Sequence, residues 1–236
     1  MRAIEIKKLH YKYPDGTMAL RGVDLRIESG ESVYLIGPNG SGKSTLLLHL
    51  NGIIQPQQGQ VLILGMDMRK KTREVKSKVG LVFQNPDDQL FMPTVFEDVA
   101  FGPVNMKLGE KEIKIRVKKA LKAVGLEGFE GRSSHHLSYG EKKRVAIATV
   151  LSMDPEILVL DEPTLSLDPW IKNDFMKLLK ELGKGHTLLI SGHDLDLMKL
   201  CDRTYLLNNG KITRKISKKC DIFKKTPNKR NFEKRS

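Results

Sequence analysis

Residues 37–45 read Gly-Pro-Asn-Gly-Ser-Gly-Lys-Ser-Thr and lie between the apolar run 33–36 and the helix-like stretch 46–50. Glycines at this spacing allow the backbone to turn successive N–H groups inward around an anion. A helix that starts near Lys43 would direct its positive dipole end at the same point. Lys43 would then reach the β- and γ-phosphates, and the Ser44 hydroxyl would be a ligand of Mg²⁺. The sequence therefore predicts that the chain binds a nucleoside triphosphate.

We call residues 37–45 the phosphate loop. A glycine-rich turn that merely caps a helix is the alternative interpretation, and the strand-like and helix-like flanks argue against it. The candidate nucleotide-binding residues of the loop are Gly37, Pro38, Asn39, Gly40, Ser41, Gly42, Lys43, Ser44 and Thr45.

The composition is that of a soluble globular protein. With 236 residues, 39% of them apolar, the chain is long enough for one large domain or for a core with a subdomain. No apolar run approaches the roughly 18 residues that a transmembrane helix needs, and the N-terminus alternates like a strand rather than a signal peptide. Cys201 and Cys220 are too few for a disulfide framework. We expect a reducing, cytosolic location.

The net charge of +13 is concentrated at the C-terminus. Residues 211–236 hold eleven Lys or Arg and two Asp or Glu, a net charge of +9, which leaves +4 for residues 1–210. A basic tail on a nearly balanced body is more typical of a solvated extension near anionic headgroups than of a DNA-binding protein. We therefore expect a poorly ordered basic tail over 217–236 and no specific nucleic-acid partner.

Short apolar and β-branched runs predict the strands of an α/β fold. Two runs near the N-terminus are typical of paired strands, at 4–13 and 23–28. Four short runs are typical of buried parallel strands, at 33–36, 79–83, 157–160 and 187–191. The turn sequence Asn208-Asn209-Gly210 would join strands 205–207 and 211–216 into a hairpin.

Helical periodicity appears between the runs 79–83 and 157–160, at 110–124 and 141–151. The sequence thus predicts a single α/β domain over 1–236 with a parallel sheet, an N-terminal antiparallel β subdomain and an inserted helical subdomain. Its expected parts are a discontinuous catalytic core, a helical subdomain and the tail, at 1–85 with 156–216, at 86–155, and at 217–236.

Two adjacent carboxylates, Asp161 and Glu162, follow the apolar run 157–160. A carboxylate at the tip of a buried strand beside a phosphate loop can hold Mg²⁺, and Asp161 takes that role. Side chains alternate along a strand, so Glu162 points elsewhere and could polarise the water that attacks the γ-phosphate. The alternative is that these two carboxylates are simply acidic residues where a strand meets a loop, with no catalytic role.

Polar side chains follow two further strands. Gln84 comes after the run 79–83, where a neutral amide can touch Mg²⁺ or the attacking water. His193 follows the run 187–191, where an imidazole can donate to the γ-phosphate. Each residue alone would be weak evidence, and their combination with Asp161 and Glu162 is what favours a catalytic site.

The segment Leu137-Ser-Tyr-Gly-Glu141 precedes the helix-like stretch that ends at 151. Ser138 and Glu141 have the spacing of a capping box, which is a complete structural explanation. A second anion site at the helix start is the functional alternative. Residue types and spacing leave both open.

The motifs and the order in which they follow one another along the chain resemble those of the ATP-binding subunits of ABC transporters. The match covers nearly the whole chain. They are the phosphate loop, a glutamine loop at Gln84, a signature at 137–141, the Asp161-Glu162 strand end, an Asp loop at Leu167-Asp168 and a switch histidine at His193. The resemblance implies the P-loop NTPase fold of an ABC ATPase, ATP as substrate and Mg²⁺ as cofactor. It also implies a head-to-tail dimer in which the signature of one subunit, Ser138, Tyr139, Gly140 and Glu141, faces the ATP of the other.

In this family an aromatic residue near the N-terminus stacks on adenine. Tyr13 matches this position best, and Tyr11 is the alternative. Two departures stand out: Tyr139 replaces the commoner second glycine of the signature, and Leu165 occupies a place where a small residue is usual in the Asp loop.

Within the family, 83–90 and 95–102 resemble energy-coupling factor (ECF) importers, and 135–148 is similar to their cobalt and nickel branch. This resemblance implies a peripheral subunit on the cytoplasmic face of the membrane. It implies a second ATPase subunit, most simply a homodimer, together with a membrane coupling subunit and a substrate-binding membrane subunit. A groove for coupling helices would lie near 84–101. His135 and His136 are not interpreted as metal ligands, because the ATPase lies outside the path of the metal.

Two other functions remain as alternatives. A vitamin-importing ECF ATPase would have identical chemistry and another substrate. A DNA-associated ABC ATPase is less favoured, because such proteins carry coiled-coil or zinc-bearing insertions between the phosphate loop and the signature. Ser138 lies 95 positions after Lys43, and the segment between them contains no cysteine.

Overall fold

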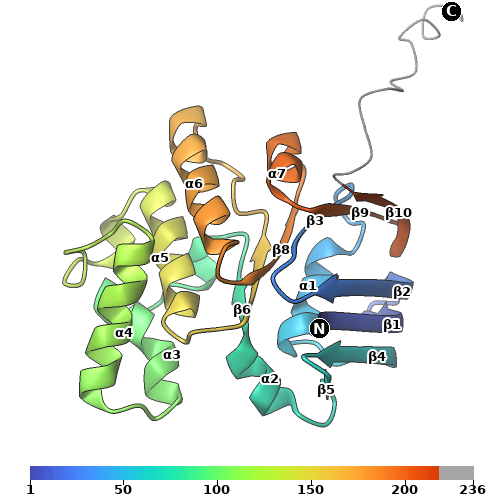
Figure 1. Cartoon of the computed structure of the whole chain (residues 1–236), viewed down its shortest axis with the longest axis horizontal. Helices are drawn as coiled ribbons and strands as arrows, with labels where there is room; N and C mark the ends of the chain where they lie inside the picture. Colours follow the sequence, from blue (N-terminus) through green and yellow to red (C-terminus); the bar gives the residue numbers. More distant parts are fainter. Residues whose placement is uncertain (218–236) are drawn as a thin grey trace, which may run out of the picture.

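The computed structural model describes residues 1–217, which form two β-sheets with helices between and beside them (Figure 1). The predicted basic tail, apart from residue 217, lies outside the described residues, as does Cys220. Among residues 1–217 no helix combines the length and the apolar character that crossing a membrane requires.

The first sheet is antiparallel and has the strand order β2-β1-β4-β5. It confirms the predicted N-terminal pairing, although the second strand starts at Met18 rather than at 23. Tyr13 lies in the turn after β1 rather than in the strand. The last two strands were not predicted from the sequence. The bounds are β1 Arg2–Lys12, β2 Met18–Glu28, β4 Gln58–Ile63 and β5 Met66–Asp67.

The second sheet has the order β10-β9-β3-β8-β7-β6, and its strand pairs are parallel except for the β9–β10 hairpin. The four predicted parallel strands and the predicted hairpin are all present, with ends that shift by at most two residues. The α/β fold is therefore confirmed. The bounds are β3 Ser32–Ile36, β6 Val79–Val82, β7 Ile157–Asp161, β8 Thr187–Gly192, β9 Arg203–Asn208 and β10 Lys211–Ser217.

The parallel sheet separates two hydrophobic cores, because successive side chains of a strand point to opposite faces. Along β7, Ile157 and Val159 join the core that contains the antiparallel sheet and helix α1 (Lys43–Asn51). Leu158 and Leu160 join the core on the other face, together with residues of helices α3 to α7. Helix α1 thus packs between the two sheets, which fixes the phosphate loop at its N-terminus.

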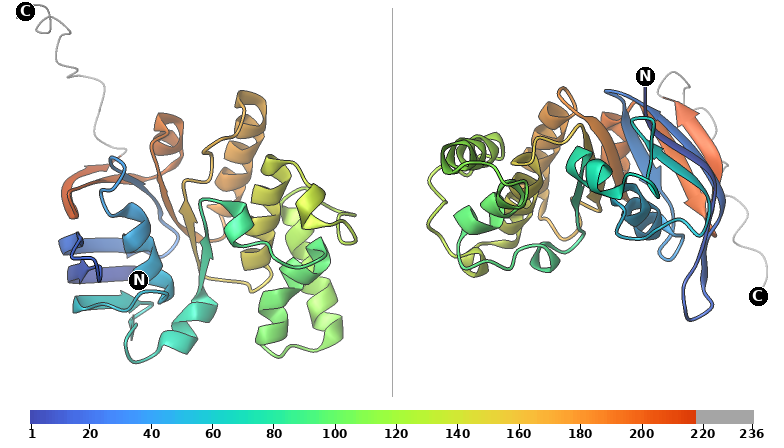
Figure 2. Two further views of the ribbon diagram at one scale, coloured as in Figure 1. Left: turned by 180° about the vertical axis from the view of Figure 1, so that it is seen from behind. Right: turned by 90° about the horizontal axis from the view of Figure 1, so that it is seen from below.

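Helices α3, α4 and α5 pack against one another at the end of the molecule opposite the antiparallel sheet (Figure 2). Helix α5 begins at Tyr139, two residues earlier than expected, because Ser138 is its N-cap and forms the predicted capping box with Glu141. The residue limits of the helical subdomain remain a prediction. The helix bounds are α2 Thr72–Lys78, α3 Val95–Asn105, α4 Glu110–Ala123, α5 Tyr139–Leu151, α6 Pro169–Leu182 and α7 Leu195–Leu200, with short 3-10 turns at Pro86–Asp88 and Ser134–His136.

The first residue of the phosphate loop touches β9. A Cβ atom on Gly37 would lie 2.1 Å from the Leu207 carbonyl oxygen, a contact that forces the backbone to move. We expect Gly37→Ala to lower the free energy of unfolding by about 1–3 kcal/mol, the usual cost of overpacking, as measured by thermal denaturation. Gly131→Ala is the matched control, because a Cβ there meets nothing within 4 Å. Equal melting temperatures for the two variants would contradict this account of the loop.

Candidate nucleotide-binding and hydrolysis site

One pocket of about 590 Å³ opens beside the carboxyl ends of the parallel strands. The loops after β3, β6, β7 and β8 all reach it, because parallel strands end at the same edge of a sheet. Its predicted lining residues are Tyr13, Asn39 to Thr45, Gln84, Glu162 and His193, and Leu165 of the Asp loop also lines it. Residues separated by up to 180 positions in the sequence therefore share one site.

The N-terminus of α1 leaves its first N–H groups available to a ligand. Gly42 is the N-cap residue, with a φ of 104° and no side chain that could accept a hydrogen bond from the first turn. A Cβ on Gly42 would lie 2.6 Å from the Ala19 carbonyl oxygen, so both its conformation and its surroundings favour glycine. Unpaired N–H groups and the helix dipole together form an anion site.

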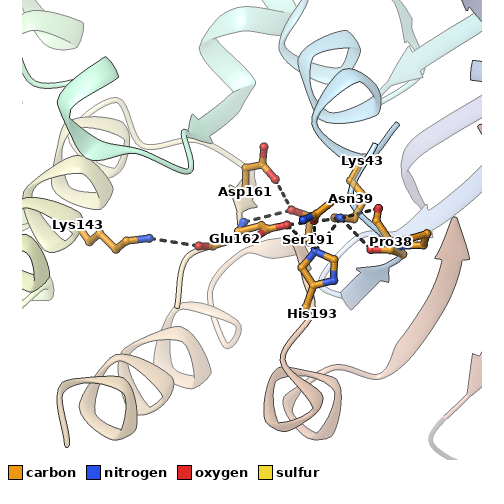
Figure 3. Close-up of polar contacts among 9 residues, drawn as sticks. Pro38, Asn39, Lys43, Lys143, Asp161, Glu162, Ser191 and His193 are labelled. Carbon is orange, nitrogen blue, oxygen red and sulfur yellow. Dashed lines mark hydrogen bonds and ion pairs between the residues drawn. The ribbon is translucent and has the colours of Figure 1, made fainter. Parts of the chain in front are cut away.

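Lys43, Glu162 and His193 meet in the middle of the pocket (Figure 3). The Lys43 ammonium donates to the Gly37 carbonyl at 2.9 Å and lies 3.4 Å from a Glu162 carboxylate oxygen. His193 Nε2 lies 3.1 Å from the same carboxylate oxygen and 2.8 Å from Asn39 Oδ1. The Lys43 ammonium, which can only donate, lies 3.2 Å from the same Nε2 atom, so the role of Nε2 depends on the tautomer of His193.

Asp161 and Glu162 point in different directions, as predicted, but Glu162 lies one residue beyond β7 with a φ of 44°, so strand alternation is not the cause. The Ser191 hydroxyl of β8 donates to Asp161 Oδ1, while the Glu162 carboxylate faces Lys43 and His193. Mg²⁺ prefers oxygen ligands and keeps waters and substrate phosphates around one or two carboxylates. The oxygen donors at this edge fit that preference, and Ser44, Gln84 and Asp161 are the residues that would hold Mg²⁺.

The two candidate tyrosines lie differently. Tyr11 packs edge-on against the ring of His49, whose centroid is 4.9 Å away, on the side of the core. Tyr13 lines the pocket, and its hydroxyl forms a hydrogen bond of 3.0 Å with Thr45 Oγ1. This arrangement favours Tyr13 as the adenine-stacking residue.

The signature does not line the pocket of its own chain. Ser138 and Glu141 satisfy each other at the start of α5, and hydrogen bonds from Ser138 lower the pKa of Glu141. A Cβ on Gly140 would lie 2.9 Å from Ile171, so the start of α6 packs against the signature. Asp168 of the Asp loop caps α6 by accepting from the N–H groups of Trp170 and Ile171.

Two residues that hold this site together were not predicted from the sequence. Ser191 accepts a hydrogen bond from the Glu162 N–H, and its place as the polar residue at the end of the run 187–191 was a usable signal. Lys143 of α5 donates to the carbonyl oxygens of Gln84 and Glu162 at 3.3 and 3.2 Å. Burial lowers the pKa of Lys143 to about 8, although the carboxylates of Glu162 and Asp161 act in the opposite direction.

Residues 20–165, more than half of the chain, match the model of the ABC transporter family. The chain belongs to this family. The ABC ATPase is 54% identical over 228 residues to the energy-coupling factor transporter ATP-binding protein EcfA of Methanocaldococcus jannaschii, covering 94% of this chain and 81% of the relative. The EcfA protein of Methanococcus maripaludis is also 54% identical, over 90% of this chain and 78% of the relative. The resemblance to ECF-type ATPases is therefore confirmed.

Solved structures agree with this assignment of the ABC ATPase. CbiO1 of Clostridium perfringens, described as part of the ABC transporter complex cbiONQ, superposes with a TM-score of 0.83 at 43% identity, over 92% of this chain and 88% of that one. An ATP-binding cassette dimer in a post-hydrolysis state with bound ADP and phosphate gives a TM-score of 0.82 at 31% identity, over 91% of this chain and 98% of that one.

The geometry of Tyr13 leads to a prediction about nucleotide affinity. We expect Tyr13→Ala to weaken ATP binding about tenfold, because base stacking on an aromatic ring contributes about 1–3 kcal/mol. Tyr13→Phe removes only the hydrogen bond between the hydroxyl group and Thr45, and its affinity for ATP should stay within about threefold of that of the parent protein. Fluorescence titration with a nucleotide analogue measures both. A larger loss in Tyr11→Ala than in Tyr13→Ala would contradict the assignment.

Proposed function

We propose that the chain is the ATP-hydrolysing subunit of a membrane import complex and that it works as a nucleotide-sandwich homodimer. The observation that carries the proposal is the Glu162 carboxylate, which lies 3.4 Å from the Lys43 ammonium and 3.1 Å from His193 Nε2. A base, a phosphate-binding cation and a proton donor thus converge above the N-terminus of α1, as hydrolysis of a γ-phosphate requires.

In this mechanism each side chain has one task. The amides at the start of α1 and the Lys43 ammonium bind the β- and γ-phosphates, which replace the contact between Lys43 and Glu162. Glu162 is then free to accept a proton from the attacking water, and His193 donates from Nε2 to the γ-phosphate. Asp161, Gln84 and Ser44 would hold Mg²⁺, which neutralises charge on the phosphate oxygens when bound.

The location of the signature supports the dimer. Ser138, Tyr139, Gly140 and Glu141 lie at the start of α5, and none of them lines the pocket that contains Lys43. A second copy in head-to-tail orientation would bring its signature to this pocket and close the site. One chain supplies every required element, so two identical chains are sufficient.

The dimer leads to a prediction for Glu162→Gln. We expect this variant to bind ATP with unchanged affinity and to hydrolyse it about 100-fold more slowly, because only the general base is lost. ATP should then convert the variant to a dimer, as measured by analytical ultracentrifugation, while ADP should not. Glu156→Gln is the control, since Glu156 pairs with Lys78 on the surface. Full hydrolysis by Glu162→Gln would remove this carboxylate from its role.

We further propose that a groove beside the glutamine loop receives a short helix of the membrane coupling subunit. The groove has a volume of about 1010 Å³, and Phe83, Phe91, Phe101 and Met106 provide its apolar lining. Phe91 and Phe101 are 60% and 44% exposed and pack edge to face. Exposed aromatic rings in a groove are typical of surfaces that bind an amphipathic helix. The chain would thus be peripheral, on the cytoplasmic face of the membrane.

The groove can be tested by copurification with the membrane subunits from the source cells. We expect Phe101→Glu to lose them, because a buried carboxylate without a partner opposes docking, while ATP affinity stays unchanged. Ile115→Glu is the control, since Ile115 is an apolar residue of α4 that is 62% exposed and does not line the groove. Equal capture by both variants would rule out the groove as the docking site.

The same captured complex tests the transported substrate, which we propose to be cobalt or nickel ions. The support is the resemblance of 135–148 to the metal-importing branch. Binding of Co²⁺ or Ni²⁺ by the membrane subunits is the expected outcome. Binding of a vitamin instead would assign the chain to vitamin uptake and would leave its ATPase chemistry unchanged.

A further inference from the structure

Lys143 is a buried lysine that connects α5 to the catalytic strand ends. The residue is 3% exposed, and its ammonium donates to the Gln84 carbonyl at 3.3 Å and to the Glu162 carbonyl at 3.2 Å. Figure 3 shows the side chain extending from α5 towards Glu162, on the side away from Lys43. The same ammonium lies 5.3 Å from the centroid of the Tyr139 ring.

This placement is unfavourable for stability alone. Within residues 1–217 no carboxylate lies within ion-pair distance of Lys143. Its ammonium contacts two carbonyl oxygens and the face of an aromatic ring, and the carboxylates of Glu162 and Asp161 act on it only from a greater distance. Burying an ammonium group without a carboxylate partner costs free energy that an apolar side chain of the same length would not. The burial of Lys143 therefore needs an explanation other than a contribution to folding stability.

The backbone of Glu162 provides this reason. Glu162 has a φ of 44°, a left-handed conformation that is strained for a residue with a side chain. Its N–H donates to Ser191, and its carbonyl accepts from Lys143. The peptide groups on both sides of the Glu162 Cα atom are thus held, one by β8 and the other by α5, and the direction of the carboxylate follows from them.

We propose that Lys143 is a positioning residue. It holds the backbone of Gln84 and Glu162 against α5, the helix that begins within the signature, and thereby orients the Glu162 carboxylate. This inference rests on the proposed ATP hydrolysis. In the proposed dimer the start of α5 serves the partner's ATP, while Gln84 and Glu162 serve the ATP of their own chain. Lys143 therefore transmits the position of the signature at one nucleotide to the catalytic groups at the other.

The test uses the full chain and compares two substitutions of Lys143. Lys143→Met keeps the length and apolar stem and removes the donor and its charge. We expect kcat to fall about tenfold, because small misplacement of a catalytic group is costly, while KM for ATP stays within about twofold. The Hill coefficient for ATP should fall towards 1. Lys143→Gln restores a donor and should recover at least half of the lost kcat.

Stability separates positioning from a structural role. We expect the melting temperature of Lys143→Met to equal or exceed that of the parent protein, since the buried charge is removed. Lys142→Met is the control, because the adjacent Lys142 forms a surface ion pair with Asp87 at 2.7 Å and should keep kcat within about twofold.

Two results would overturn the inference: unchanged kcat in Lys143→Met, or a parallel fall of kcat and melting temperature that Lys143→Gln does not reverse. Failure of the proposed function itself would be recognised separately, by absence of ATP hydrolysis in the parent protein.

Discussion

The parallel register of β3, β8 and β7 is the constraint on which the site depends. Ile36 pairs with Gly192, and Asp161 pairs with Ser191, so the three strands end level with one another. The phosphate loop, Glu162 and His193 each follow one of these ends within two residues. A slip of one residue in any strand would exchange its two faces and would transfer its side chains between the two hydrophobic cores. Core packing therefore also fixes the catalytic geometry.

Much of the fold and of the candidate site could be predicted from the sequence, because the parallel strands are short apolar runs followed directly by polar residues. The run 157–160 indicates the buried strand, and Asp161 and Glu162 point in different directions as predicted, whereas the left-handed backbone that orients Glu162 could not be predicted from the sequence. The capping box at Ser138 could be predicted for the same reason, since it depends on local spacing alone. Strands β4 and β5 were missed because their pattern is interrupted by glycine and polar residues.

Contacts that depend on tertiary neighbours could not be predicted. Lys142, Lys143 and Arg144 are consecutive basic residues that look equivalent in the sequence. In the structure Lys142 pairs with Asp87, Lys143 reaches two buried carbonyls, and Arg144 donates to the Val124 carbonyl. Helical geometry separates their directions by about 100° per residue, and only the packing of α5 against the sheet decides which one is buried.

The strand order also bears on when the site can form during synthesis. Strand β3, which leads into the phosphate loop, pairs with β8 and β9, so that Ser32 meets Leu188 across some 150 residues of chain. When β3 and α1 leave the ribosome, neither neighbouring strand of β3 has yet been made. Contacts of such long range form late and slowly in folding. A growing chain therefore carries a complete phosphate-binding sequence well before it has a nucleotide site, and ATP can select for the native topology only after β8 and β9 have been synthesised.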